Sequence, residues 1–344
     1  MAYFATPAKY RNAVLTVGSL VFYAVGEPVY VFLMIASIAA NYFLALGIAK
    51  YRGRNSGRLL LMLAVLIDFG GLFFFKYLVF FTRNICALIG RNAPEINVVL
   101  PLGISFYTFQ IMSYVIDVYR GKYSVCRSFT EVAAYISMFP QLIAGPIVSF
   151  DEVRPQLEKR RVTVKNIEWG IMLFVVGLVY KVLFANKIAS LWNDVMTVGV
   201  MGADTALVWL GAWGYAMQIY FDFFGYSLMA MGIGKLLGFN FPGNFLSPYC
   251  AVSVTDFWRR WHITLGTWFR DYLFYPIIRT KLFQKVAKSK KLPKFVKTKL
   301  PTIAGLAVVW LITGIWHGAD WHYAAWGIYL SLIHISEPTR PEPI

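Results

Sequence analysis

The feature that most constrains the fold is the uncharged apolar run Val29–Ala49, VYVFLMIASIAANYFLALGIA. A helix of about 20 such residues is long enough to cross the hydrocarbon core of a bilayer. The run is too long for a secretory signal, and no small-residue cleavage site separates it from the basic residues that follow. Further apolar segments lie at 13–26, 59–81, 99–117, 167–185, 205–234, 302–316 and 321–333. The sequence therefore predicts an all-α polytopic membrane protein.

Composition and charge agree with this prediction. Hydrophobic residues make up 58% of the chain and charged residues 15%, whereas soluble domains carry about 25% charged residues. The net charge of +16 does not indicate a nucleic-acid partner, because the basic residues cluster in short loops between apolar segments. Loops 50–58 and 120–127 contain no acid, which places them in the cytoplasm by the positive-inside rule. The three cysteines show no CxxC spacing and predict neither a disulfide framework nor a zinc site.

The longest basic stretch, 279–299, contains many lysines and no acid. Two interpretations stay open. The stretch is either a cytoplasmic loop that lies against anionic membrane lipids or a docking surface for an acidic donor or carrier.

The chain predicts a single membrane domain over 1–333, because no low-complexity linker divides it. No internal repeat is evident, which counts against a transporter built from duplicated halves. The last residues, 334–344, are polar and proline-rich, and we expect them to be a non-native tail outside the domain. His334 falls in this tail and receives no function.

Two segments differ from simple spans. SMFPQLIAGPIVSF (137–150) contains two prolines and a glycine between basic flanks, which predicts a re-entrant segment that lines a cavity. DFWRRWHITLGTWFRDY (256–272) has an aromatic stripe and a polar stripe at helical spacing. It predicts one helix at the membrane interface or along a wet cavity. An interfacial anchor explains its tryptophans but explains the Arg-Arg-Trp-His cluster poorly.

Two of the four histidines, His317 and His322, lie in TGIWHGADWH (313–322). On a helix they point about 140° apart, which is poor metal-binding geometry, and no HExxH motif is present. No metal site is therefore predicted, and the absence of a GxSxG elbow leaves a serine hydrolase unsupported. A histidine within the membrane indicates a functional site, so the residues alone leave His317 open as a general base or a core histidine.

Several long motifs resemble the membrane-bound O-acyltransferase (MBOAT) family, in particular the bacterial branch that contains the membrane subunit of alginate O-acetylation. The resemblance runs from about Lys9 to Trp326, and family members are usually longer at both ends, so we expect part of a first span and the last spans to be missing. The motifs are DFWRRWHITLGTWFRDYLFYP (256–276), WLITGIWHGADWHYAAWG (310–327), PLGISFYTFQIMSYVIDVYRG (101–121), FPQLIAGPI (139–147) and QIYFDFFGYSLMAMGIGKLLGF (218–239).

The resemblance implies a multi-helix bundle around a central tunnel, with re-entrant and interfacial helices. It places His317 at the family's catalytic position and His262 at a second position that holds His or Asn. His322 matches no family histidine, and we expect it to pack in the structure. The substrate-binding candidates are Trp316, Trp261, Arg259 and Asp222, and the last two are also candidates for structural ion pairs.

By this resemblance the chain would move an acyl group, with acetyl favoured, from a cytoplasmic thioester to hydroxyls of a cell-envelope or secreted polysaccharide. The expected donor is acetyl-CoA or an acyl carrier, with no bound cofactor. A periplasmic or extracellular acetyltransferase is the expected partner, and the bacterial inner membrane the expected location, with several passes. Two alternatives remain: D-alanyl transfer during teichoic-acid alanylation, and a transporter or flippase.

Overall fold

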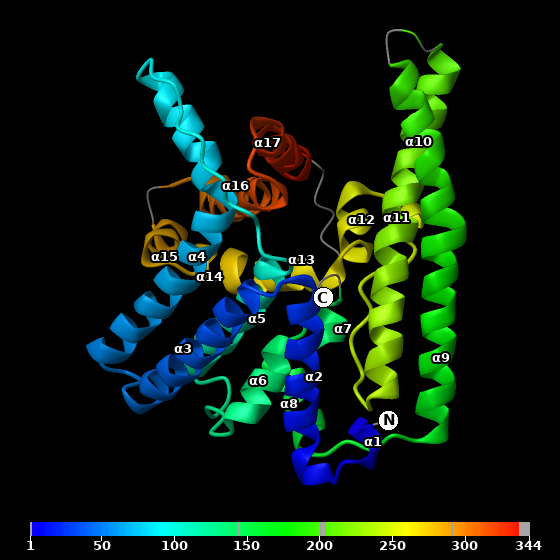
Figure 1. Ribbon diagram of the computed structural model, residues 1–344. Helices are drawn as coiled ribbons and strands as arrows, with labels where there is room; N and C mark the ends of the chain where they lie inside the picture. Colours follow the sequence, from blue (N-terminus) through cyan, green and yellow to red (C-terminus); the bar gives the residue numbers. More distant parts are fainter. Residues whose placement is uncertain (1, 143–144, 200–201, 203, 290–291, 337–344) are drawn as a thin grey trace. The chain divides into compact units, whose positions relative to one another are not determined.

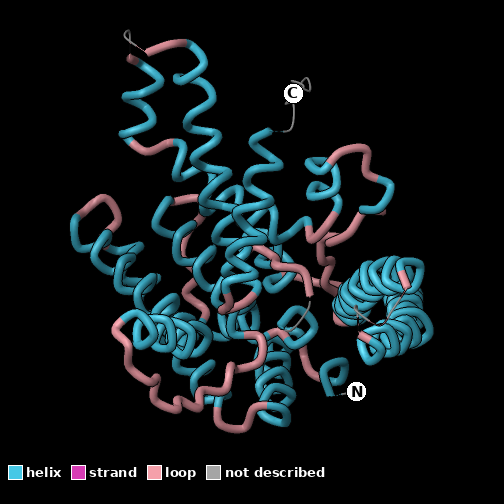
Figure 2. The backbone as a smooth tube through the Cα atoms, turned by 90° about the horizontal axis from the view of Figure 1, so that it is seen from above, coloured by secondary structure: helices cyan, strands magenta, loops and turns pink. Residues whose placement is uncertain are grey.

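The computed structural model describes residues 2–142, 145–199, 202, 204–289 and 292–336. In this part of the chain the regular elements are helices, and no strand occurs among them (Figure 2). The chain divides into two compact units: Met1–Leu61 with Ser105–Phe245, and Met62–Ile104 with Leu246–Ile344.

The first unit contains the N-terminal helices and the long helices of the middle of the sequence (Figure 1). Its elements are α1 (Ala2–Ala5), η1 (Ala8–Tyr10), α2 (Arg11–Gly26), α3 (Tyr30–Lys50), α5 (Ile104–Arg120), α6 (Phe129–Ser137), α7 (Phe139–Leu142), α8 (Phe150–Glu158), α9 (Val164–Val179), η2 (Tyr180–Ala185), α10 (Asn186–Val198) and α11 (Thr205–Leu236).

The second unit contains most of α4 (Asn55–Leu88), which starts in the first unit, and the elements that follow residue 246. These elements are η3 (Pro248–Cys250), α12 (Val254–Arg260), α13 (Ile263–Phe269), η4 (Arg270–Phe274), α14 (Tyr275–Ile278), α15 (Lys281–Lys288), α16 (Lys294–His317) and α17 (Trp321–Ser336).

Four helical stretches are long and apolar enough to cross a membrane: Tyr30–Lys50, Asn55–Leu88, Val164–Val198 and Val296–His317. Many of their large apolar side chains are exposed on the protein surface, as expected where lipid rather than water is the neighbour. The predicted all-α membrane fold is confirmed. The central tunnel stays a prediction.

In the first unit, α9 and α11 lie side by side along their length (Figure 1). Glycines form the seam between them. A Cβ atom on Gly170 would lie 2.9 Å from the carbonyl oxygen of Gly232, and one on Gly225 would lie 2.8 Å from the carbonyl oxygen of Gly177. Small residues allow the close backbone approach that holds membrane helices together when burial of apolar surface cannot drive their association.

The segment predicted to be re-entrant is broken, as its prolines and glycine require. α6 ends at Ser137, α7 spans one turn, and residues 143–144 lie outside the described chain. The side-chain amide of Gln141 donates to the Tyr135 carbonyl (2.6 Å), and the Tyr135 hydroxyl donates to the Val148 carbonyl (2.8 Å). These bonds satisfy backbone groups in the interior of the first unit. Its predicted cavity lining stays a prediction.

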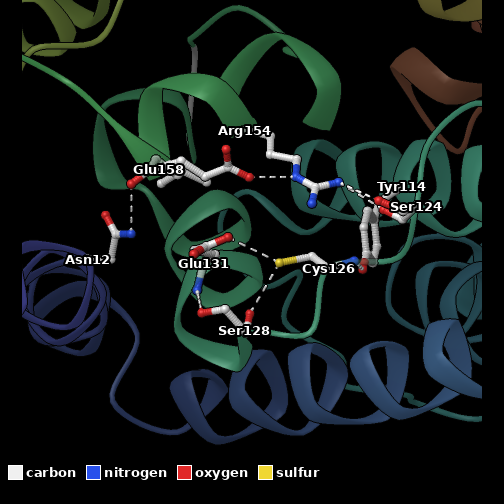
Figure 3. A network of polar contacts seen from close by, with 9 residues as sticks. Asn12, Tyr114, Ser124, Cys126, Ser128, Glu131, Arg154 and Glu158 are labelled. Carbon is white, nitrogen blue, oxygen red and sulfur yellow. Dashed lines mark hydrogen bonds and ion pairs between the residues drawn. The ribbon is translucent and has the colours of Figure 1, made fainter. Parts of the chain in front are cut away.

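A polar network surrounds Cys126 in the predicted cytoplasmic loop (Figure 3). The thiol donates to a Glu131 carboxylate oxygen at 3.2 Å, and the Cys126 N–H donates to the Tyr114 hydroxyl at 3.3 Å. Arg154 donates to the Ser124 carbonyl at 2.9 Å. Burial raises the pKa of Cys126 to about 12, so the thiol stays protonated and serves the structure.

In the second unit, α16 and α17 form another glycine seam. A Cβ atom on Gly327 would lie 2.6 Å from the Trp310 carbonyl oxygen, and one on Gly314 would lie 2.8 Å from the Cα of Gly327. α17 continues past the predicted boundary at residue 333, so His334 lies in the helix rather than in a tail, with its ring stacked on Trp310 at 4.3 Å. Residues 337–344 lie outside the described chain.

Candidate active site

The sequence predicts one helix over 256–272, and the structure shows that this prediction is wrong. The helix breaks between α12 and α13, where Trp261 is extended and His262 has a left-handed backbone with a φ of 45°. At the break, the Arg260 carbonyl accepts the Leu246 N–H at 2.9 Å. A left-handed backbone costs a non-glycine residue about 1–2 kcal/mol, and such strain persists where the surrounding structure holds it, often at functional sites.

The break turns the His262 side chain into the protein interior, where only 4% of its surface is exposed. Burial lowers the pKa of His262 to about 3, with a smaller contribution of the same sign from His317. The ring is therefore neutral at physiological pH. A neutral imidazole offers one N–H donor and one acceptor nitrogen.

His317 is the last residue of α16. Gly318 follows it with an extended backbone, and a Cβ atom there would lie 2.1 Å from the Tyr323 ring. Any larger residue at this position would therefore require the Tyr323 ring to move. The His317 residue is exposed, and its ring contacts two tryptophans, with centroids 4.8 Å from the Trp316 ring and 5.2 Å from the Trp326 ring.

His262 and His317 line one pocket of about 390 Å³, although they come from different elements. This volume lies within the range of small-molecule sites. The Trp316 ring lies beside both histidines, with its centroid 6.5 Å from that of His262. Arg259 and Trp261 also line the pocket. The aromatic and aliphatic residues of the remaining walls include Trp258, Leu265, Phe269, Leu306 and Trp310, and the polar ones include Thr313, Arg270 and His334.

The structure thus brings together five of the six predicted site residues, and their roles stay predictions. The sixth, Asp222, belongs to the first unit, where its carboxylate forms an ion pair with Lys181. This contact is the structural role that was weighed beside substrate binding for Asp222.

His322 does not pack in the interior, contrary to the prediction. Its side chain is 66% exposed, and its Nδ1 atom lies 2.9 Å from an Asp320 carboxylate oxygen. The reason is its position in the first turn of α17, directly after the exposed turn that contains Asp320. Among the described residues, no three His, Cys, Asp or Glu side chains gather in a way that could hold a metal ion.

Sequence reasoning missed Lys76, which lies on α4 and donates a hydrogen bond to the Trp316 carbonyl. Its ammonium also lies 5.3 Å from the centroid of the Trp316 ring. A signal was present, because Lys76 interrupts the apolar sequence GGLFFFKYLVFF, and a charge inside a membrane span usually has a function.

The protein thus combines an all-α membrane fold with a pocket lined by His262, His317 and His334. Residues 124–337 match the profile described as MBOAT, membrane-bound O-acyltransferase family, and this range includes His262 and His317. The chain belongs to this family.

The chain is also similar in sequence to curated bacterial proteins, among them these three. The chain is 37% identical to "Probable alginate O-acetylase AlgI" of Azotobacter vinelandii, over 95% of its own length and 63% of that relative. It is 33% identical to "Peptidoglycan O-acetyltransferase" of Helicobacter pylori, over 95% and 65%. It is 29% identical to "Teichoic acid D-alanyltransferase" of Streptococcus thermophilus, over 66% and 54%. The chain therefore spans less than two thirds of the length of these relatives.

Proposed function

We propose that the protein is an O-acyltransferase that moves an acetyl group from a thioester donor to hydroxyls of a cell-envelope or secreted polysaccharide. The observation that carries the proposal is the meeting of His262 and His317 at one pocket. The higher identity to the O-acetylating relatives favours acetyl over D-alanyl as the transferred group.

In the proposed mechanism, a ring nitrogen of neutral His317 takes the proton of the acceptor hydroxyl as the oxygen attacks the thioester carbonyl. The carbon–oxygen bond forms, and the carbonyl oxygen becomes an oxyanion. The carbon–sulfur bond then breaks, and the imidazolium returns its proton to the departing thiolate. The products are an ester and a free thiol, so His317 is unchanged after one turnover.

His262 would stabilise the oxyanion or orient the acceptor through its N–H group. Its buried and constrained position supports this role, because a donor that is already fixed needs no reorganisation during the reaction. Trp316, Trp261 and Arg259 would hold the substrates at the pocket.

The proposal includes a cellular context, of which the charge pattern supports the loop topology. We place the protein in the bacterial inner membrane with several passes, and the loops 50–58, 120–127 and 279–299 in the cytoplasm. The donor is acetyl-CoA or an acyl carrier on the cytoplasmic side, and the acceptor is reached directly or through a secreted acetyltransferase. Single cysteines introduced in these loops should resist an impermeant thiol reagent applied to intact cells. Ready labelling from outside would contradict this topology.

A direct experiment compares two donors in membranes that contain the chain. Labelled acetyl-CoA should transfer its acetyl group to an added polysaccharide, and a labelled D-alanyl carrier protein should not. The His317→Ala variant should lose the signal, and His322→Ala, an exposed histidine five residues further on, should keep it. Transfer from the D-alanyl carrier alone would assign the chain to the other branch. Uptake of substrate into vesicles without transfer would indicate a transporter.

A further inference from the structure

A second pocket, of about 300 Å³, lies where α4 meets the turn between α16 and α17. Its lining residues, all in the second unit, are Lys76, Val79, Phe80, Arg83, Asn84, Ala319, Asp320 and Trp321. Lys76, Arg83 and Asp320 give it two cations and one acid. By contrast, the described residues that line the histidine pocket include Arg259 and Arg270 and no acid.

Lys76 and Arg83 lie seven residues apart on α4, so both face the same side of the helix. In the part of the chain that the structure describes, neither forms an ion pair with a carboxylate. The one acid of the pocket, Asp320, contacts His322 instead. Cations in a membrane-spanning helix are costly unless a charge partner or a ligand accompanies them.

The second pocket adjoins the candidate active site through Trp316 and the turn that follows His317. Lys76 donates to the Trp316 carbonyl, and the Trp316 ring lies beside His317 with centroids 4.8 Å apart. Ala319, two residues after His317, lines the second pocket. A molecule bound between Lys76 and Arg83 is therefore close to the end of α16.

The geometry of the pocket is fixed by polar contacts. The Trp321 indole N–H donates to the Asn84 side-chain carbonyl at 2.8 Å, which joins the start of α17 to α4. Arg83 is exposed, so its guanidinium is accessible to a ligand. A guanidinium binds a carboxylate with two parallel hydrogen bonds, and an ammonium adds a point charge beside it.

We propose that this pocket binds a carboxylate of an acidic polysaccharide acceptor and thereby places a nearby sugar hydroxyl at His317. The inference rests on the proposed function and adds a recognition site to it. Two cations and one acid leave a single positive charge in the pocket, which matches a carboxylate better than a doubly charged phosphate. The histidine pocket, which has many aromatic and aliphatic residues in its walls, then takes the acyl group, and the second pocket takes the carboxylate of the acceptor.

The experiment measures binding and not turnover. The full chain with the His317→Ala substitution is placed in discs of neutral lipid, and its affinity for oligomannuronate is compared with its affinity for the carboxyl-reduced oligosaccharide. The acidic form should bind about tenfold more tightly, the size of one charge-assisted hydrogen bond. The additional substitution Arg83→Gln should remove this preference. Asp320→Asn should strengthen binding of the acidic form, because it removes the repelling charge.

Lys285→Gln is the matched control, because it removes one exposed positive charge from α15, outside the pocket. It should leave the preference intact. Equal affinity for the two oligosaccharides, or equal loss in Arg83→Gln and Lys285→Gln, would overturn the proposal. Displacement of the oligosaccharide by anionic phospholipid vesicles at equal concentration would also overturn it, in favour of a lipid headgroup. Because the background variant lacks turnover, these outcomes do not depend on whether acetyl transfer occurs.

Discussion

Two pairs of neighbouring helices, α9 with α11 and α16 with α17, pack through glycines in the same way but differ in the polar residues beside their contacts. In both pairs, glycines let the backbones approach until no Cβ atom would fit. In the first pair, Asp222 of α11 forms an ion pair with Lys181 of η2, the element that continues α9. The second pair ends at His317, beside two pockets. Close packing alone therefore does not distinguish the two pairs, and the proposed chemistry rests on the histidine at the end of α16.

The largest expected effect is the loss of acyl transfer when His317, at the end of α16, is replaced. His317→Ala should lower acyl transfer about 10²- to 10⁴-fold, because it removes the proposed base. Transfer from labelled acetyl-CoA gives the rate, and membrane level with thermal unfolding shows whether the fold is intact. If the variant transfers acetyl at the normal rate, His317 is not the base, and the α16–α17 pair has no catalytic role that the α9–α11 pair lacks.

The next expected effect concerns the two seams. Gly327→Ala and Gly225→Ala should each destabilise the protein by about 1–3 kcal/mol, the usual cost of overpacking, because each new Cβ atom meets a backbone carbonyl. Only Gly327→Ala should also lower turnover of the folded protein. Unfolding temperature and turnover per folded molecule separate the two effects.

Gly18→Ala on α2 is the control for these substitutions, since its Cβ atom would meet nothing within 4 Å. It should leave the unfolding temperature unchanged or raise it, because alanine has the higher helix propensity. Equal loss of turnover in Gly225→Ala and Gly327→Ala would show that both seams serve the active site.

A smaller effect is expected at His262. His262→Ala should depress turnover less than His317→Ala does, because an orienting group is less essential than the base. His262→Asn should retain more activity than His262→Ala, since its amide still forms hydrogen bonds and asparagine tolerates the left-handed backbone. Turnover and unfolding temperature are measured for both. Full activity in His262→Ala would leave α12 and α13 as an interfacial anchor only.

The smallest effect is expected in the first pair. The double substitution Lys181→Met with Asp222→Asn removes an ion pair whose side chains are 26% and 36% exposed. The stability change should be at most about 1 kcal/mol, as for other exposed pairs, and turnover should stay normal. A large loss of transfer, measured with labelled acetyl-CoA at unchanged stability, would return Asp222 to the list of substrate-binding residues.

Four of the eight predicted apolar segments, 29–49, 59–81, 167–185 and 302–316, correspond to helices that are long and apolar enough to cross a membrane in the part of the chain that the structure describes. They were predictable because bilayer thickness sets the length of an apolar run. The predicted run 29–49 and the observed α3 differ by one residue at each end. By contrast, the break at His262 was missed. The apolar and polar stripes of 256–272 continue at helical spacing across it, and the hydrogen bond from Leu246 that stabilises it comes from a residue outside the segment.

The site was predictable only in part for a similar reason. Sequence spacing carries no information on whether His262 and His317 meet, and the expectation came from resemblance to a family. Lys76 reaches Trp316 from 240 positions away, a contact that only the fold creates. His322 was expected to pack because it matches no histidine of the family and points about 140° away from His317 on a helix, whereas the start of α17 leaves it exposed.

The left-handed backbone at His262 restricts which amino acids can replace this histidine during evolution. Single-nucleotide changes in a histidine codon lead to Tyr, Asn, Asp, Leu, Pro, Gln or Arg. Of these, only Asn and Asp commonly adopt the left-handed region, and Asp would place a negative charge in a buried site. Of the residues that a single nucleotide change can produce, asparagine alone both tolerates the left-handed backbone and is uncharged in the buried site. The local geometry therefore leaves His to Asn as the one tolerated single-nucleotide substitution at this position.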